Sequence, residues 1–113
     1  MLLKLLFKKK FHFLLKDGFA CEVFCWNSET SFLFQRNNLQ FGFFYDSCEA
    51  SLYATVKIEN SNYRFVECPF LSENERKSLT EELSYVEKLN NVEPLLDVYK
   101  KYIILVLQRV SSN

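Results

Sequence analysis

The residues of this chain that could carry chemistry are four cysteines, at positions 21, 25, 48 and 68, and a single histidine, His12. Cys21 and Cys25 form a C-x3-C pair that could chelate a metal from one face of a helix. On the strand predicted here their sulfurs would lie roughly 13 Å apart, too far to share an ion. Cys48 and Cys68 lack the close spacings of a zinc site. We therefore expect structural thiols, with metal or redox use as the alternative, and no metal or cofactor.

His12 lies between Phe11 and Phe13 on a segment that we expect to be a strand, so it would face away from both rings. With a carboxylate such as Asp17 or Asp46 nearby it could act as a general base. No nucleophile motif, phosphate-binding loop or zinc-protease helix accompanies it. The sequence therefore predicts no catalytic residue, and a small enzyme centred on His12 or a cysteine is the third-ranked alternative.

Length and composition indicate one globular domain over residues 1–113, because the chain is 49% hydrophobic and 25% charged. The net charge is zero, but residues 1–16 hold five lysines and no acid, while residues 72–93 hold six glutamates against three basic residues. A neutral net charge argues against a dedicated nucleic-acid-binding protein, whose affinity comes largely from neutralising phosphates. The uneven placement leaves two regions of opposite sign that could meet a charged partner.

The beginning of the chain, MLLKLLFKKK, is apolar first and basic second, the reverse of a secretory signal. No stretch approaches the roughly 20 apolar residues that span a bilayer, and the longest candidate runs over 102–107. We therefore expect no membrane span, a cytoplasmic location and reduced cysteines, with disulfides as the alternative.

The first two thirds of the chain are predicted to form strands joined by short turns. Asp17-Gly18 and Asn37-Asn38 are expected to be hairpin turns, and Asn60-Ser61-Asn62 a third turn. The clearest strand alternates apolar and polar residues with period two over ten positions. The predicted strands cover residues 10–16, 19–26, 31–36, 39–46, 50–59 and 63–68.

The last third is predicted to be largely helical. Ser72 and Glu75 form a capping-box pattern, and leucines at helical spacing then predict a helix over 72–90. Pro94 suits the first turn of a second helix. Residues 102–110 stay open between helix and strand, and their six consecutive large apolar residues fit a buried strand slightly better.

Together these elements predict an α+β fold: an antiparallel β-sheet of five or six strands with one or two C-terminal helices packed on one face. On the outer face we expect Phe44, Tyr53 and Trp26 to emerge beside charged residues, a composition typical of protein–protein hot spots. The equally weighted alternative is that a helix or the final strand covers these rings.

The lysines at 8–10 alternate with phenylalanines at 7, 11 and 13. We expect them to protect an edge strand against unwanted pairing. A nucleic-acid or membrane surface, or another interface, is the alternative.

Binding rather than catalysis is the expected function, and the best candidate is an immunity protein or antitoxin of a bacterium. Such a protein would neutralise a basic toxin by stoichiometric binding, steered by its acidic residues. The runner-up is a ligand- or nucleic-acid-binding module that uses the open sheet face and the lysine-rich N-terminus, and a homodimer stays open. The candidate binding residues are Phe44, Asp46, Glu49, Tyr53, Glu73, Glu81 and Glu87.

Overall fold

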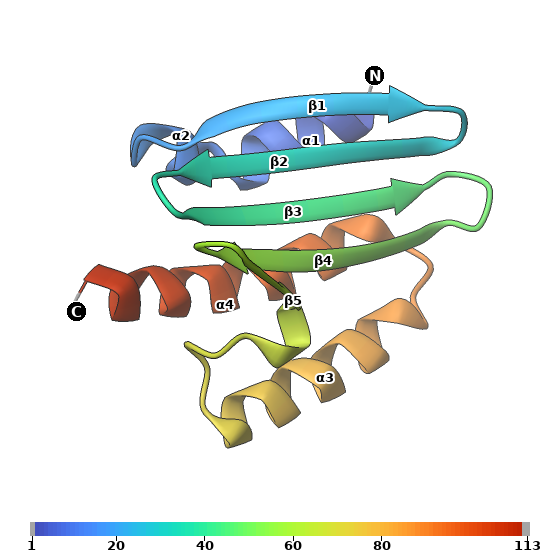
Figure 1. Cartoon of the computed structure of the whole chain (residues 1–113). Helices are drawn as coiled ribbons and strands as arrows, with labels where there is room; N and C mark the ends of the chain where they lie inside the picture. Colours follow the sequence, from blue (N-terminus) through green and yellow to red (C-terminus); the bar gives the residue numbers. More distant parts are fainter. Residues whose placement is uncertain (1, 112–113) are drawn as a thin grey trace. The chain divides into compact units, whose positions relative to one another are not determined.

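The computed structural model describes residues 2–111, and within them the chain forms five strands, four α-helices and one 3-10 turn (Figure 1). The strands form one antiparallel sheet in the order β1-β2-β3-β4-β5, each paired with its neighbours in sequence. The predicted α+β class is therefore confirmed. The strands are β1 Ala20–Trp26, β2 Glu29–Arg36, β3 Leu39–Asp46, β4 Ser51–Ile58 and β5 Ser61–Arg64. The helices are α1 Leu2–Lys10, α2 His12–Lys16, the 3-10 turn η1 Phe65–Glu67, α3 Glu73–Glu87 and α4 Val92–Ser111.

The described chain divides into two compact units. Residues 12–65 contain α2 and the whole sheet and are called the sheet unit below. The described residues before and after them contain α1, α3 and α4 and are called the helical unit. The single-domain interpretation stays a prediction.

Three of the sheet's turns are two residues long and begin with a residue of positive φ: Asn27 at 54°, Asn37 at 54° and Glu59 at 57°. Asparagine tolerates this conformation, which explains why the predicted turn at Asn37 is confirmed. The last turn is Glu59-Asn60 rather than residues 60–62, so the predicted strand over 63–68 is wrong in extent. Strand β5 covers Ser61–Arg64, and η1 follows directly.

The predicted strand over residues 10–16 is wrong, because Lys10 ends α1 and residues 12–16 form α2. The Phe11 amide donates to the Phe7 carbonyl at 3.0 Å, and these two fully buried rings, four residues apart, have their centroids 5.9 Å apart. Leu14 of α2 is fully buried as well. The richness in aromatic residues favoured a strand, but the 3.6-residue period decided the structure.

Asp17-Gly18 is likewise not a hairpin turn but the end of α2. Gly18 has φ +91° and its amide donates to the Leu15 carbonyl at 3.2 Å, while the Phe19 amide donates to the Leu14 carbonyl at 3.0 Å. This pair of hydrogen bonds is the Schellman motif, in which glycine supplies the left-handed residue. The first hairpin of the sheet therefore joins β1 to β2.

The predicted helix over 72–90 is confirmed as α3, together with its capping box. The Ser72 amide donates to Glu75 Oε1 at 2.8 Å, and the Glu75 amide donates to Ser72 Oγ at 3.2 Å. Arg109 of α4 also donates two hydrogen bonds to the Glu75 carboxylate, which ties the start of α3 to the end of α4 within the helical unit. The hydrogen bond from Arg109, followed by the one from the Ser72 backbone, lowers the pKa of Glu75 to about 2.

Residues 102–110, for which a strand fitted slightly better, are part of α4. Tyr99, Tyr102, Ile103 and Val106 are buried, while Ile104 is 39% exposed. Their spacing of three, four and seven residues is the buried stripe of a helix. A run of six apolar residues hid this period, because the exposed positions of the helix are apolar too.

The sheet unit is held mainly by aromatic rings. Phe41 contacts Phe19 and Phe65 with ring centroids 5.8 and 6.2 Å apart, and Phe34 meets Phe43 edge to face at 6.1 Å. These rings, with Val56 and the neighbouring buried residues, all lie on one face of the sheet, and their burial supplies most of the unit's stabilisation.

Candidate functional site

The other face of the sheet carries exposed side chains, and the strand register arranges them in four rows. Side chains that are directly paired across neighbouring strands project from the same face. The first row is Trp26, Glu29, Asp46 and Ser51, and the second is Phe24, Ser31, Phe44 and Tyr53. The third row is Glu22, Leu33, Gly42, Thr55 and Arg64, and the fourth is Ala20, Gln35, Gln40, Lys57 and Asn62.

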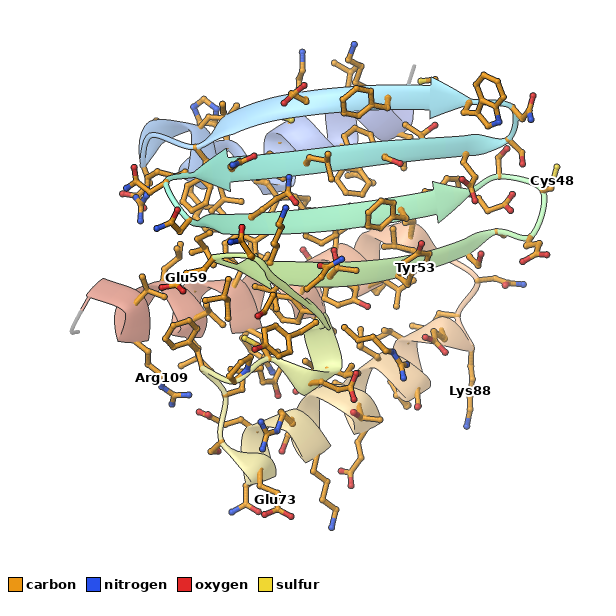
Figure 2. All side chains as sticks on the ribbon, viewed as in Figure 1. Cys48, Tyr53, Glu59, Glu73, Lys88 and Arg109 are labelled. Carbon is orange, nitrogen blue, oxygen red and sulfur yellow. The ribbon has the colours of Figure 1, made fainter. Side chains whose placement is uncertain are left out.

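Four large aromatic side chains gather in the first two rows, and we call Phe24, Trp26, Phe44 and Tyr53 the aromatic patch. Trp26 is 75% exposed, Tyr53 58% and Phe24 50%, whereas Phe44 is half-buried. Phe44 and Tyr53 stack with their centroids 5.0 Å apart and their planes 19° from parallel. Figure 2 labels Tyr53 on β4. Phe24 and Trp26 on β1 are separated from the Phe44–Tyr53 pair on β3 and β4 by Ser31 and Glu29 of β2, and all four rings lie on one face at one end of the sheet. Exposed aromatic side chains gathered in this way are typical of an interface.

Gly42 allows the half-buried ring of this patch to lie flat on the sheet. A Cβ atom at Gly42 would stand 2.8 Å from Thr55 Oγ1, 3.1 Å from Phe44 Cε2 and 3.3 Å from Leu33 Cδ2. The side chains of Phe44 and Leu33 therefore cover the glycine backbone, as aromatic residues do beside strand glycines. A side chain at position 42 would therefore crowd the Phe44 ring that stacks on Tyr53.

Acidic residues border the aromatic patch at the same end of the sheet, and we call Glu29, Asp46 and Glu49 the acidic rim. Glu29 and Asp46 lie in the first row, and Glu49 is exposed in the β3–β4 turn. The Asp46 carboxylate accepts a hydrogen bond from the Cys48 amide at 2.9 Å, which shapes that turn. Glu29 and Glu49 form no ion pair with any residue in the described part of the chain.

The two turns at this end are joined to each other, which makes the rim one structural unit. The Ser47 amide donates to the Ser28 carbonyl at 2.9 Å, and the Ser47 hydroxyl donates to the same oxygen at 3.1 Å. The β1–β2 turn and the β3–β4 turn are therefore hydrogen-bonded to each other, and Glu29, which follows the first turn, is paired directly with Trp26.

The opposite end of the same face is polar and basic. Lys57 and Arg64 are exposed there, and Gln40 donates to Gln35 at 3.5 Å. No aromatic ring occupies the fourth row. The open face therefore changes from acidic and aromatic to basic and polar over the length of its strands.

The structure brings together three of the seven predicted binding residues on one face, namely Phe44, Asp46 and Tyr53, with Glu49 in the adjoining turn. The other three, Glu73, Glu81 and Glu87, are exposed on α3 in the helical unit. Glu73 lines a shallow surface hollow of about 430 Å³ together with Arg76 and Lys77, so its surroundings carry both signs of charge. Their part in binding stays a prediction.

Two members of the site were missed as candidates. Phe24 lies two residues before Trp26 on the same strand, so the period of two already placed both rings on one face. The predicted strands over 19–26 and 31–36 leave Glu29 outside the sheet, but the Asn27-Ser28 turn is only two residues long and Glu29 begins β2. Predicting a two-residue turn after Trp26 would have placed Glu29 at the start of the next strand, opposite Trp26.

The residues considered for catalysis or metal binding do not converge. None of the four cysteines, all of which lie in the described chain, forms a disulfide, and burial raises the pKa of the Cys68 thiol. His12 is exposed at the start of α2 rather than on a strand. Among residues 2–111 no three His, Cys, Asp or Glu side chains are grouped closely enough to hold a metal ion.

The lysines at 8–10 do not protect an edge strand, so that prediction is wrong. They end α1, and Lys10 pairs with Glu93 at 3.0 Å and with Asp97 at 2.8 Å, both on α4. Lys8 and Lys9 are exposed.

Within the described chain no helix has the length and apolar character needed to cross a bilayer. Comparison with protein-family models, with curated proteins and with solved structures finds no match to this chain.

Proposed function

We propose that this protein binds another protein through the aromatic patch and the acidic rim. The observation that carries the proposal is the coincidence of three strongly exposed rings and unpaired carboxylates at one end of one sheet face. Exposed Trp and Tyr side chains are the residues that contribute most to interface free energies when a partner buries them. Phe44 and Tyr53 are already stacked on each other, so less conformational entropy is lost when a partner buries them.

The chemistry of the site selects a basic partner. Glu29 and Glu49 have no ionic partner in the described chain, so a lysine or arginine can pair with them without displacing an internal contact. Such a cation can also lie over the face of Trp26 or Tyr53, an arrangement favoured by the quadrupole of the ring. Nucleic acid is a poor fit to this end, because its phosphates would be repelled by the same carboxylates.

Within this class we propose a stoichiometric inhibitor, such as an immunity protein or antitoxin that acts in the cytoplasm of a bacterium on a basic toxin. Its support is the small size of the chain and the acidic charge of the binding end, which would steer a basic domain into contact. The proposal assigns the chain no catalytic step. Its specific consequence is that the partner loses its own activity at a one-to-one ratio.

The test is affinity capture from native cells at moderate salt with three forms of the full chain. The patch variant carries Trp26→Ser and Tyr53→Ser, and the control variant carries Lys57→Ser and Gln40→Ser at the other end of the same face. All four positions project from the open face, so neither variant removes a core ring. We expect a protein retained by the wild type and the control, in equal amounts with the bait, and lost by the patch variant.

The same experiment can overturn the proposal. Equal recovery by the patch variant would move the interface elsewhere. Recovery of nucleic acid instead of protein, with loss on the control variant and a steep dependence on salt, would establish the runner-up function at the basic end.

A further inference from the structure

The two edges of the sheet differ in how well they are protected against another strand. Strand β5 is four residues long, and η1 follows it directly, so this edge is short. Strand β1 is seven residues long and pairs only with β2. It contains no proline, lysine or arginine, and its register with β2 runs over seven residues without a bulge. Proteins normally use such residues and bulges to prevent edge pairing, and the exposed Glu22 is the one charged side chain that β1 carries.

The side chains of β1 are largely exposed. Five of its seven residues are exposed and the remaining two, Cys21 and Val23, are half-buried. In an antiparallel pair every second residue turns its amide and carbonyl away from the neighbouring strand. Strand β1 therefore presents a row of outward backbone groups, which is the template that a further strand needs.

We propose that β1 pairs with β1 of a second copy of this chain, antiparallel and centred on Val23, which extends the sheet across a twofold axis. A symmetric antiparallel pair of one strand overlaps completely only when its middle residue lies on the axis. For the seven residues Ala20–Trp26 that residue is Val23. The inference does not depend on the proposed binding function of the open face.

The side chains are complementary in this register. Trp26 lies beside the partner's Ala20, so the largest residue of the strand meets the smallest. Glu22, its one charged residue, lies beside the partner's Phe24, and Cys21 lies beside the partner's Cys25. Each pair occurs twice because of the twofold axis.

Neighbouring registers are worse, which is why a second copy fits this edge in one way. Centring the pair on Glu22 would place two like charges directly opposite each other, which destabilises a strand pair. It would also shorten the overlap to residues 20–24. Centring on Phe24 would leave only residues 22–26 paired. The register at Val23 alone combines full overlap with separated charges.

The test uses the two cysteines that this register places opposite each other. Neighbouring strands lie about 5 Å apart, within the Cα separation that a disulfide allows. The background is the full chain with Cys48→Ser, which removes the exposed thiol of the β3–β4 turn and leaves Cys68 buried. Either Cys21→Ser or Cys25→Ser is added to it. Each protein is oxidised with diamide, alone and as an equal mixture of the two variants, and analysed on a non-reducing gel.

We expect a covalent dimer from the background protein, loss of that dimer in each single variant, and its return in the mixture. The mixture regains it because Cys25 of one variant then faces the partner's Cys21. Sedimentation equilibrium of the reduced wild-type chain is expected to show a dimer. A monomer at every concentration tested would overturn the proposal. So would a covalent dimer formed by either single variant alone, or none from the background protein.

Discussion

The sheet unit and the helical unit of this protein use their charges in opposite ways. In the helical unit, Lys10, Glu75, Glu82, Lys101 and Arg109 are joined in ion pairs between helices. In the sheet unit, the ion pair formed among described residues is Arg36 with Asp17 at 2.6 Å, at the basic end. The three residues of the acidic rim form no ion pair with any residue in the described part of the chain.

This difference separates charges that stabilise the fold from charges that are available to a partner. Glu82 accepts hydrogen bonds from Lys101 and Tyr102, and burial together with the bond to Glu82 raises the pKa of Tyr102 to about 12. Such groups are already satisfied by the helical unit itself. Glu29 and Glu49 are exposed, lie beside exposed rings and contribute nothing comparable to the sheet unit. The carboxylates of Glu29 and Glu49 are therefore available to pair with a partner, and this is the physical basis of the proposed interface.

The largest effect on stability is expected where the sheet unit depends on a ring. Changing Phe43→Ala should lower the free energy of unfolding by about 3–5 kcal/mol, because Phe43 is fully buried and leaves a cavity. Its neighbour gives a matched control: Phe44→Ala removes an open-face ring stacked on Tyr53 and should cost about 1 kcal/mol. Urea denaturation measures both. Equal losses of stability in the two variants would contradict the assignment of Phe43 to a buried face of β3 and Phe44 to an open one.

Replacing a charged residue of the helical unit should instead change how the stability of the protein depends on pH. The pKa of Glu75 is lowered from 4.5 to about 2 by Arg109 and the Ser72 backbone, so its ionised form stabilises the fold. That stabilisation is complete above pH 4.5 and is lost as the pH falls from about 4.5 through about 2. Glu75→Gln should therefore be less stable than the wild type at neutral pH, and the difference should shrink in acid.

The control for this pH experiment is Glu73→Gln, two residues earlier on α3, where the carboxylate forms no ion pair with the described residues. Thermal unfolding at a series of pH values gives both curves. A difference between wild type and Glu75→Gln that stays constant down to the lowest pH would contradict the assigned role of Arg109.

A smaller loss is expected at the start of α3. Ser72→Ala removes the hydroxyl oxygen that accepts a hydrogen bond from the Glu75 amide. This change should lower the free energy of unfolding by about 1 kcal/mol. Ser84→Ala, at an exposed position near the end of the same helix, should change the free energy of unfolding little, because alanine is the better helix former there. If both variants lost the same amount, the capping box would have no special part in the helical unit.

The smallest effect is a gain in the sheet unit. Glu59 holds φ at 57°, a conformation that costs most residues energy but that asparagine tolerates. Glu59→Asn should therefore raise the free energy of unfolding by about 0.5–1 kcal/mol. Lys57→Asn, on the neighbouring strand, should lower it, since asparagine is a poor strand residue. A loss of stability in Glu59→Asn would show that the glutamate makes a contact that matters more than its backbone.

Much of the sheet could be predicted because local signals and long-range packing agree there. The alternation along β4 marked its buried and exposed faces, and Asn37 marked the turn before β3. The capping box at Ser72 fixed the start of α3. These signals are local, so a single sequence shows them.

The errors arose where composition and period disagreed. Residues 10–16 are rich in rings that favour strands, but the spacing of Phe7, Phe11 and Leu14 was helical. Over residues 102–107 every position of α4 is apolar, which masks the buried stripe of the helix. Gly18 ended a helix and not a hairpin, because glycine serves both roles.

The candidate site could be predicted only in part, because it depends on register between strands far apart in sequence. Phe44 and Tyr53 followed from the alternation of two adjacent strands, which pair directly. Phe24 follows from Trp26 by the period of two along β1, whereas Glu29 requires the register of β1 with β2, and thus the length of the Asn27-Ser28 turn. A turn one residue longer would have moved these side chains to the other face.

Trp26 provides the most direct test of the central claim, because it is the single tryptophan of the chain and lies 75% exposed in the aromatic patch. A chain labelled with fluorotryptophan has one fluorine resonance, which reports this position alone. The partner recovered by affinity capture is titrated into the labelled protein at moderate salt. We expect the resonance to shift until one equivalent is reached and to become protected from a solvent paramagnetic agent. A resonance that keeps its position and its solvent exposure in the saturated complex would contradict binding at the aromatic patch.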